Sequence, residues 1–342
     1  MCFIMRRIKE LEKQIAAMTI FVLLSALIAT AVAFMGHYMR QQDSIRKYLE
    51  NSTSVCRVPD IDRGFIPQGL SYHADSDSIL LTGYMSNGNN SPVYIISRKN
   101  GQAKKISLRT PQGNAFKGHA GGVSLYNDFV YIAGSTEGCM YGLALNDLLQ
   151  AEDGVSRNAD FIVALKNEAD QIRVSFTAAD REFLYAGEFH RAPLFYTHAS
   201  HTVMTPDGKQ KAYLLGFVPD AEESAVPSCV YSIPDNIQGA CFDDKFIYLS
   251  QTDGVFSARI LTYAREELTT DATKEVLGID VPLYYLTENS AHKITQVAPM
   301  AEEILIVDDK LYILFESASN RYRFGKKLGL DYILSTPCSF FH

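Results

Sequence analysis

The chain has 342 residues, of which 47% are hydrophobic and 21% charged, and its formal net charge is −7. This composition excludes a largely disordered chain, because disordered segments contain few apolar residues. The acidic balance argues against the broad basic surface that a nucleic-acid backbone requires, so no nucleic-acid partner is expected. Length leaves the number of domains open, because all-β domains often use roughly 200 to 300 residues as one unit.

The first element is an uncharged stretch at residues 15–36. As a helix it measures about 33 Å, enough to cross a hydrocarbon core of about 30 Å. Basic residues precede it, which favours a cytoplasmic segment at residues 1–14 and an extracytoplasmic main domain on a single-pass membrane anchor. The alternative is a secreted protein with a cleaved signal peptide, because Ala31-Val32-Ala33 fits a cleavage site. The run is longer than the usual apolar core of a signal peptide, so residues 15–36 are predicted to be a transmembrane helix and to have the membrane as their partner.

Residues 37–53 are polar and are predicted to form a stalk, and residues 54–342 carry a repeat. Each copy contains a short apolar strand, a turn rich in Asp or Asn, and a second apolar strand, which together form a hairpin. The hairpins are predicted at residues 71–83, 124–134, 177–188, 241–251 and 305–316. The spacing of their starts, 53, 53, 64 and 64 residues, predicts an all-β β-propeller with four strands in each blade. Five blades are expected, with a sixth from the longer third and fourth intervals as the alternative. A short helix is expected around residues 146–151.

A propeller must close its ring. Tyr332 to Thr336 is predicted to supply one strand of the closing blade and Ser54 to Val58 its neighbour. A disulfide between Cys56 and Cys338 would then staple the ring and add several kcal/mol in the chain-entropy model. Unpaired buried thiols are the alternative.

Polar residues open several of the predicted inner strands, which line the central channel of a propeller. Gln68 and Gln238 are predicted to bind a ligand at the channel mouth. Glu302 and His119 are the candidates for a catalytic acid or base, or for ligands of a divalent cation. The alternative is structural, because channel side chains often bond only water or tie blades together.

Other ionisable residues follow the second strands of their hairpins. Glu188 and Glu316 are predicted to reach the same mouth as ligand-binding residues, and His190 lies beside Glu188 in the sequence. Exposed loop positions are the alternative for all three. His73, His198, His201 and His292 show no metal-ligand spacing and receive no role.

The segments PQGLS, GHAGGVS, AGEFH, IQGACF and LYILFESASNRYRF lie between Pro67 and Phe324. They resemble a family of uncharacterised secreted or membrane-anchored bacterial β-propellers, distantly similar to the strictosidine-synthase and gluconolactonase-like propellers. In the lactonase-like relatives, Glu, Asn and Asp side chains hold a divalent cation at the channel mouth. This chain offers Glu302 at a comparable place but Gln68, Gln238 and His119 elsewhere, so the carboxylate-rich set of a calcium site is incomplete.

Two functions follow from these patterns. The first is a surface-displayed binding module whose ligand is a small molecule or a protein. The alternative is a metal-dependent hydrolase or lactonase with its site at the channel mouth, in which Glu302 is a ligand or base and His119 a ligand or proton shuttle. The sequence has no GxSxG or HExxH motif and no glycine-rich phosphate loop.

Overall fold

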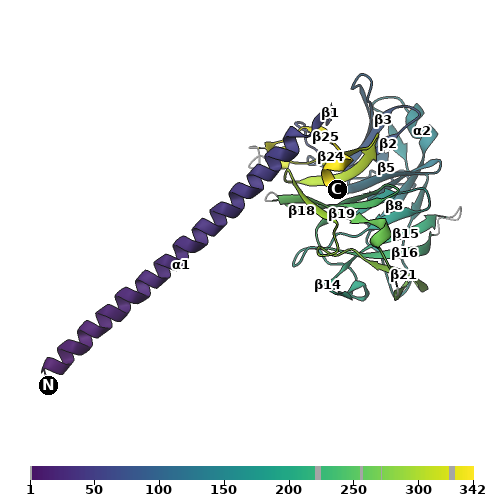
Figure 1. The fold of residues 1–342 in the computed structure, drawn as a ribbon. Coiled ribbons are helices and arrows are strands. Elements are labelled where there is room, and N and C mark those ends of the chain that lie inside the picture. Colours follow the sequence, from purple (N-terminus) through teal and green to yellow (C-terminus); the bar gives the residue numbers. More distant parts are fainter. Residues whose placement is uncertain (1, 220–224, 255–256, 271, 323–327) are drawn as a thin grey trace. The chain divides into compact units, whose positions relative to one another are not determined.

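The computed structural model describes residues 2–219, 225–254, 257–270, 272–322 and 328–342. Two compact units are present, residues 1–47 and residues 48–342. The second unit is an all-β propeller of five blades (Figure 1). The predicted fold class and blade number are therefore confirmed.

The first unit belongs to one long helix, α1 (Cys2–Glu50). Its segment from Met18 onward is long and apolar enough to cross a membrane, and a signal sequence would share these properties. Apolar side chains such as Leu23 and Val32 are about two-thirds exposed, as a lipid-facing surface requires. The polar residues predicted to form a stalk continue the helix as far as Glu50, with Asp43 paired to Arg46 and Lys47 along its surface.

The blades follow the predicted repeat, and each inner hairpin lies where the sequence placed it. Blade 1 contains β2 (Phe65–His73), β3 (Ser78–Met85), β4 (Pro92–Ser97), β5 (Ala103–Arg109) and the short parallel strand β9 (Ser156–Asn158). Blade 2 contains β6 (Ala120–Tyr126), β7 (Phe129–Gly134), β8 (Cys139–Ala144) and β10 (Phe161–Val163). The helix α2 (Leu145–Gln150) follows β8, within one residue of the predicted helix.

The longer intervals do not form a sixth blade. Blade 3 contains β11 (Phe176–Ala179), β12 (Leu184–Gly187), β15 (Ala212–Pro219) and β16 (Ala225–Ile233). Its interval also forms the hairpin β13 (Val203–Thr205) and β14 (Gly208–Gln210). Blade 4 contains β17 (Ile237–Phe242), β18 (Phe246–Asp253), β19 (Ser257–Ala264) and β22 (Lys293–Val297). The extra residues of blade 4 form β20 (Ala272–Val276) and β21 (Ile279–Tyr285), which extend blade 3 because β21 pairs in parallel with β16.

Blade 5 closes the ring with strands from both ends of the propeller domain. It contains β23 (Ala301–Val307), β24 (Lys310–Phe315), β25 (Tyr332–Pro337) and, as the outermost strand, β1 (Thr53–Arg57). The predicted neighbours of the closing blade are thus confirmed, with Thr53 opposite Ser335. Backbone hydrogen bonds between β1 and β25 hold the ring shut.

The predicted disulfide of this closing blade is not formed. Cys56 and Cys338 are buried free thiols, as are the other cysteines of the propeller. The antiparallel register explains the result: Cys56 lies at the end of β1 that faces Tyr332, whereas Cys338 follows the opposite end of β25. At about 3.3 Å per strand residue, this offset exceeds the roughly 7 Å that two Cα atoms of a disulfide can span.

The hairpin turns explain the repeated Asp and Asn residues. Asp77 and Asn127 have φ angles of 47° and 51°, a left-handed conformation that Asx residues tolerate. In the turn of blade 4, Asp243 accepts hydrogen bonds from the backbone N–H groups of Lys245 and Phe246 and from the Tyr248 hydroxyl. The Asp and Asn residues predicted at the hairpin turns thus make contacts that stabilise those turns.

The core is divided among the interfaces between neighbouring blades. Leu80 and Val93 of blade 1 pack with Val123 and Ile132 of blade 2 in one apolar cluster, and the other interfaces are built in the same manner. Because each blade buries both faces of its sheet against its neighbours, the inner strands are held at fixed positions around the axis. That arrangement positions the side chains at the channel.

Candidate functional site

Three inner strands have a shift in pairing near their starts, and these shifts determine where the polar side chains lie. The pairing of β2 with β3 shifts between Pro67 and Gly69, that of β17 with β18 between Ile237 and Gly239, and that of β23 with β24 between Ala301 and Ile304. A bulge adds residues to one strand and re-aims their side chains. The bulges contain Gln68, Gln238 and Glu302.

These side chains form a hydrogen-bonded chain at the channel mouth. The Gln68 Nε2 donates to Glu316 Oε2 at 3.1 Å, and the Gln238 Nε2 donates to Glu302 Oε1 at 3.4 Å. The Glu302 and Glu316 carboxyl groups lie close enough to interact, and a hydrogen bond between them would need a proton on one of the two. Four of the predicted site residues, contributed by blades 1, 4 and 5, therefore lie in one cluster.

The two carboxyl groups of this mouth cluster are buried, at 2% exposure for Glu302 and 7% for Glu316. Burial raises the pKa of Glu302 well above its ordinary value, and the neighbouring Glu316 raises it further. Burial also raises the pKa of Glu316 to about 7, although hydrogen bonds from Glu302, Tyr322 and Gln68 act in the opposite direction. The pair holds a shared proton near neutral pH because two close carboxylates resist joint ionisation.

His119 lies beside an aromatic and a cationic side chain. Its ring stacks on Tyr84 with a centroid distance of 3.9 Å and an interplanar angle of 15°. The Arg321 guanidinium lies 5.7 Å from the Tyr84 ring centroid and donates to the Tyr84 hydroxyl. Burial, followed by the charge of Arg321, lowers the pKa of His119, so the imidazole is neutral at physiological pH. Burial raises the pKa of Tyr84 to about 12, and the nearby Glu316 and Glu302 act in the same direction.

Glu188 belongs to a different cluster, in blade 3. It is fully buried, and its carboxylate accepts hydrogen bonds from the backbone N–H groups of Arg173 and Tyr213 at 3.1 and 3.2 Å. The His201 Nδ1 lies 2.8 Å from Glu188 Oε2, and the His201 Nε2 lies 2.8 Å from Asp170 Oδ1. The exposed loop position offered as an alternative is wrong for Glu188, Glu316 and His190, because all three side chains are buried.

Sequence reasoning missed Asp170, His198 and His201. Their metal-ligating atoms all lie within 4.8 Å of one another, which makes them a group able to hold a metal ion. The two histidines are three residues apart, a spacing that was visible in the sequence. Asp170 comes from a separate loop, and only the fold brings it to them.

Glu303 is a second residue that the sequence did not single out. Adjacent strand residues face opposite sides, and Glu303 points into the centre of the ring beside Gly122 and Gly239. Its Oε1 accepts from the N–H groups of Ala240 and Ile304 at 3.2 and 3.3 Å, whereas its buried Oε2 has no partner among the described residues. Burial raises the pKa of Glu303 well above its ordinary value, although hydrogen bonds from two backbone N–H groups act in the opposite direction. Ser71, Ser124, Thr177 and Cys241 line a cavity of about 210 Å³ together with it.

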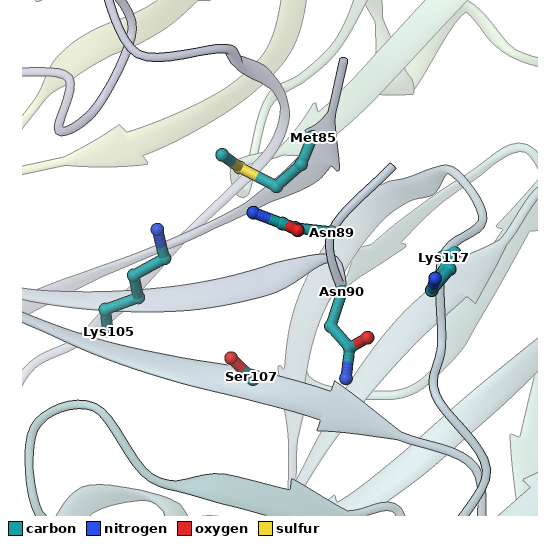
Figure 2. A pocket seen from close by; sticks show the side chains of 6 residues that line it. All are labelled: Met85, Asn89, Asn90, Lys105, Ser107 and Lys117. Carbon is teal, nitrogen blue, oxygen red and sulfur yellow. The ribbon is translucent and has the colours of Figure 1, made fainter. Parts of the chain in front are cut away.

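Another hollow lies on blade 1, away from the predicted residues. It has a volume of about 400 Å³, and Figure 2 shows the polar side chains and one methionine around it. They are Met85, Asn89, Asn90, Lys105, Ser107 and Lys117. The Lys105 ammonium donates to Asp60 Oδ2 at 2.7 Å, so part of the positive charge is already neutralised.

Comparison with known proteins shows no family for this chain. No protein-family model matches the chain, and no curated protein sequence matches it significantly. Among solved structures, the PQQ-bound aldose sugar dehydrogenase of Streptomyces coelicolor is similar, with 13% identity, a TM-score of 0.48 and coverage of 83% of this chain and 96% of that one. The glutaminyl cyclase of Myxococcus xanthus shows 12% identity and a TM-score of 0.39, covering 77% of this chain and 90% of that one. A chain of the nidogen/laminin complex shows 10% identity and a TM-score of 0.38, covering 74% of this chain and 73% of that one.

Proposed function

We propose that this chain is a membrane-anchored, extracytoplasmic β-propeller that binds a small polar ligand at its channel mouth. The observation that carries the proposal is the mouth cluster of Gln68, Glu316, Glu302 and Gln238, which three blades contribute to one place. The inner strands need no polar side chain to form, and burying one without good partners costs free energy. We therefore attribute the convergence of these side chains from three blades to the recognition of a ligand.

The chemistry of the mouth cluster suits an uncharged, hydroxyl- or amide-bearing ligand. A carboxyl pair with one shared proton offers both a donor and acceptors, and each glutamine amide does the same. Arg321 adds an exposed guanidinium beside Tyr84 and Tyr322, at 5.7 and 5.8 Å from their ring centroids. Such a set discriminates by hydrogen bonding, because a ligand lacking the matching groups would leave buried polar atoms unpaired.

Binding is favoured here over a metal-dependent hydrolase at the mouth. His119 stacks against Tyr84, and the positive Arg321 lies close enough to lower its pKa. A neighbouring cation opposes a metal ion at the same place.

The ligand proposal is tested by titrating the full chain in detergent micelles with glucose, myo-inositol and acetamide, using calorimetry. We expect at least one of them to bind saturably, and the Gln68→Ala variant to bind it at least tenfold more weakly. Gln102→Ala is the matched control, because Gln102 is exposed on blade 1 and should leave the affinity unchanged. Absence of binding by all three compounds, or equal binding by wild type and Gln68→Ala, would contradict the proposal.

The anchor is supported by the uncharged segment of α1 and by its exposed apolar side chains. With residues 15–36 in the bilayer, the basic residues at 6–13 would remain in the cytoplasm. N-terminal sequencing of the protein purified from membranes tests this. A start near Met1 supports an anchor, whereas a start at Phe34 indicates signal cleavage after Ala33. Protease treatment of intact cells should digest the propeller domain if it is extracytoplasmic.

A further inference from the structure

The loops of blade 3 bring three metal-ligating side chains together. His198 precedes the short 3-10 helix η1 (Ala199–His201), and its side chain accepts a hydrogen bond from the Ser200 N–H. Side chains three residues apart lie on the same side of such a tight turn. This places His198 and His201 next to each other. Asp170 reaches them from the loop that precedes β11.

The distances between these groups approach those of a coordinated ion. Asp170 Oδ1 lies 2.8 Å from His201 Nε2 and 3.4 Å from His198 Nδ1. In a tetrahedral zinc site with bonds of about 2.0–2.1 Å, neighbouring ligand atoms are separated by about 3.3 Å. Side-chain movements of about half an ångström would therefore open a position for the ion. Two imidazoles and a carboxylate are ligands that zinc accepts, and three protein ligands leave a fourth position for water.

Glu188 is the second observation that points to a cation. Its carboxylate is fixed by two backbone N–H groups, and it faces His201 Nδ1 from the fully buried side. It therefore favours a proton on Nδ1, so that the lone pair of Nε2 points at the Asp170 carboxylate 2.8 Å away. Either a second proton on His201 or a metal ion bound by Nε2 and Asp170 Oδ1 removes the repulsion between these two acceptors. Carboxylate, histidine and metal in this order are the usual outer-shell arrangement of zinc sites.

Access to solvent supports a metal ion at this place. The His198 side chain is 45% exposed and that of Asp170 is 12% exposed, whereas His201 is fully buried. The site thus opens to solvent on the His198 side, where an ion could enter and keep a water ligand.

We propose that Asp170, His198 and His201 bind one divalent ion of the zinc class, with Glu188 orienting His201. The site is separate from the mouth cluster and does not depend on the proposed ligand. The ion would join the loop at Asp170 to the loop at 198–201, which precedes β13.

The test is zinc binding to the full chain in detergent micelles after removal of metal with EDTA. Calorimetry should show one Zn²⁺ per chain, and Co²⁺ should give the intense visible absorption of a tetrahedral site. His198→Ala should weaken zinc binding at least tenfold, and its exposed position makes normal folding expected. Glu188→Gln should weaken binding by about 10- to 100-fold, as outer-shell changes do.

His73→Ala is the matched control. The His73 Nδ1 lies 2.8 Å from the Ser76 hydroxyl and accepts from the Ser76 N–H, as His198 does with Ser200. Its replacement should leave zinc affinity unchanged. Equal zinc affinity in wild type and His198→Ala, or no stoichiometric zinc binding by the folded wild type, would overturn the proposal and assign a proton to His201.

Discussion

The propeller buries acidic side chains in two places and neutralises them in different ways. In the mouth cluster, Glu302 and Glu316 face each other, and they share a proton. In blade 3, Glu188 and Asp170 face the two nitrogens of His201. The comparison shows that burial alone does not decide the charge of a carboxyl group. The partner matters as well, because a like-charged neighbour raises the pKa of a carboxyl group and a basic neighbour lowers it.

The largest effect is expected from removing Glu188, the buried centre of the blade 3 cluster. Glu188→Ala removes a fully buried acceptor of two backbone N–H groups and of His201, and should lower the free energy of unfolding by about 3–5 kcal/mol. Urea denaturation of the full chain in micelles measures it. Glu168→Ala, an exposed position on a neighbouring loop, is the control and should change stability by less than about 0.5 kcal/mol. Equal effects of the two variants would show that the blade 3 cluster contributes little.

A smaller loss of stability is expected from crowding Glu303 at the centre of the ring. A Cβ at Gly239 would lie 2.3 Å from Glu303 Oε1 and 2.8 Å from Glu303 Cα, so backbone must move. Gly239→Ala should therefore destabilise the chain by about 1–3 kcal/mol. In Gly118→Ala, the new Cβ would meet the flexible Glu137 carboxylate at 3.2 Å, and this control should be nearly neutral. The midpoint of thermal unfolding compares them, and similar midpoints would mean that the inner strands separate easily.

The contribution of the mouth cluster to stability should depend on pH. The pKa of Glu316 is raised to about 7 in the folded chain, so the folded state keeps a proton that the unfolded state releases above about 4.5. Its contribution to stability is complete below about pH 4.5 and is lost as the pH rises toward 7 and above. In the wild type, this loss of unfolding free energy should be at most about 3 kcal/mol between pH 5 and pH 8. The Glu316→Gln variant should not show it. Parallel stability profiles of variant and wild type would refute the shared proton.

The smallest effect is expected from reduction. The propeller cysteines are free, and pairing of β1 with β25 closes the ring that holds both clusters. Dithiothreitol should therefore leave the unfolding midpoint of the full chain unchanged. A clear decrease would reveal a disulfide and restore a covalent role for the cysteines in ring closure.

Much of the fold was predictable because its determinants are local. Alternating strands, Asx turns at left-handed φ angles and a spacing of 53 to 64 residues are properties of short segments, and they gave five hairpins and the closing strands. The convergence of Gln68, Gln238 and Glu302 was predictable because polar residues at the starts of inner strands converge on an axis, and Glu316 was predicted to reach them from the end of a second strand. The prediction failed for Cys56 and Cys338, because pairing two strands does not fix which ends meet.

The sequence by itself determined the apolar helix, the repeat and the residues that open each inner strand, because hydrophobic periodicity and turn chemistry act over a few residues. Only the tertiary structure decided that the β20–β21 hairpin extends blade 3, that Glu302 faces Glu316 while Glu303 faces the ring centre, and that Asp170 meets His198 and His201. These outcomes depend on bulges, on strand register and on contacts between distant loops. Such contacts form only when the blades pack, so no local pattern records them.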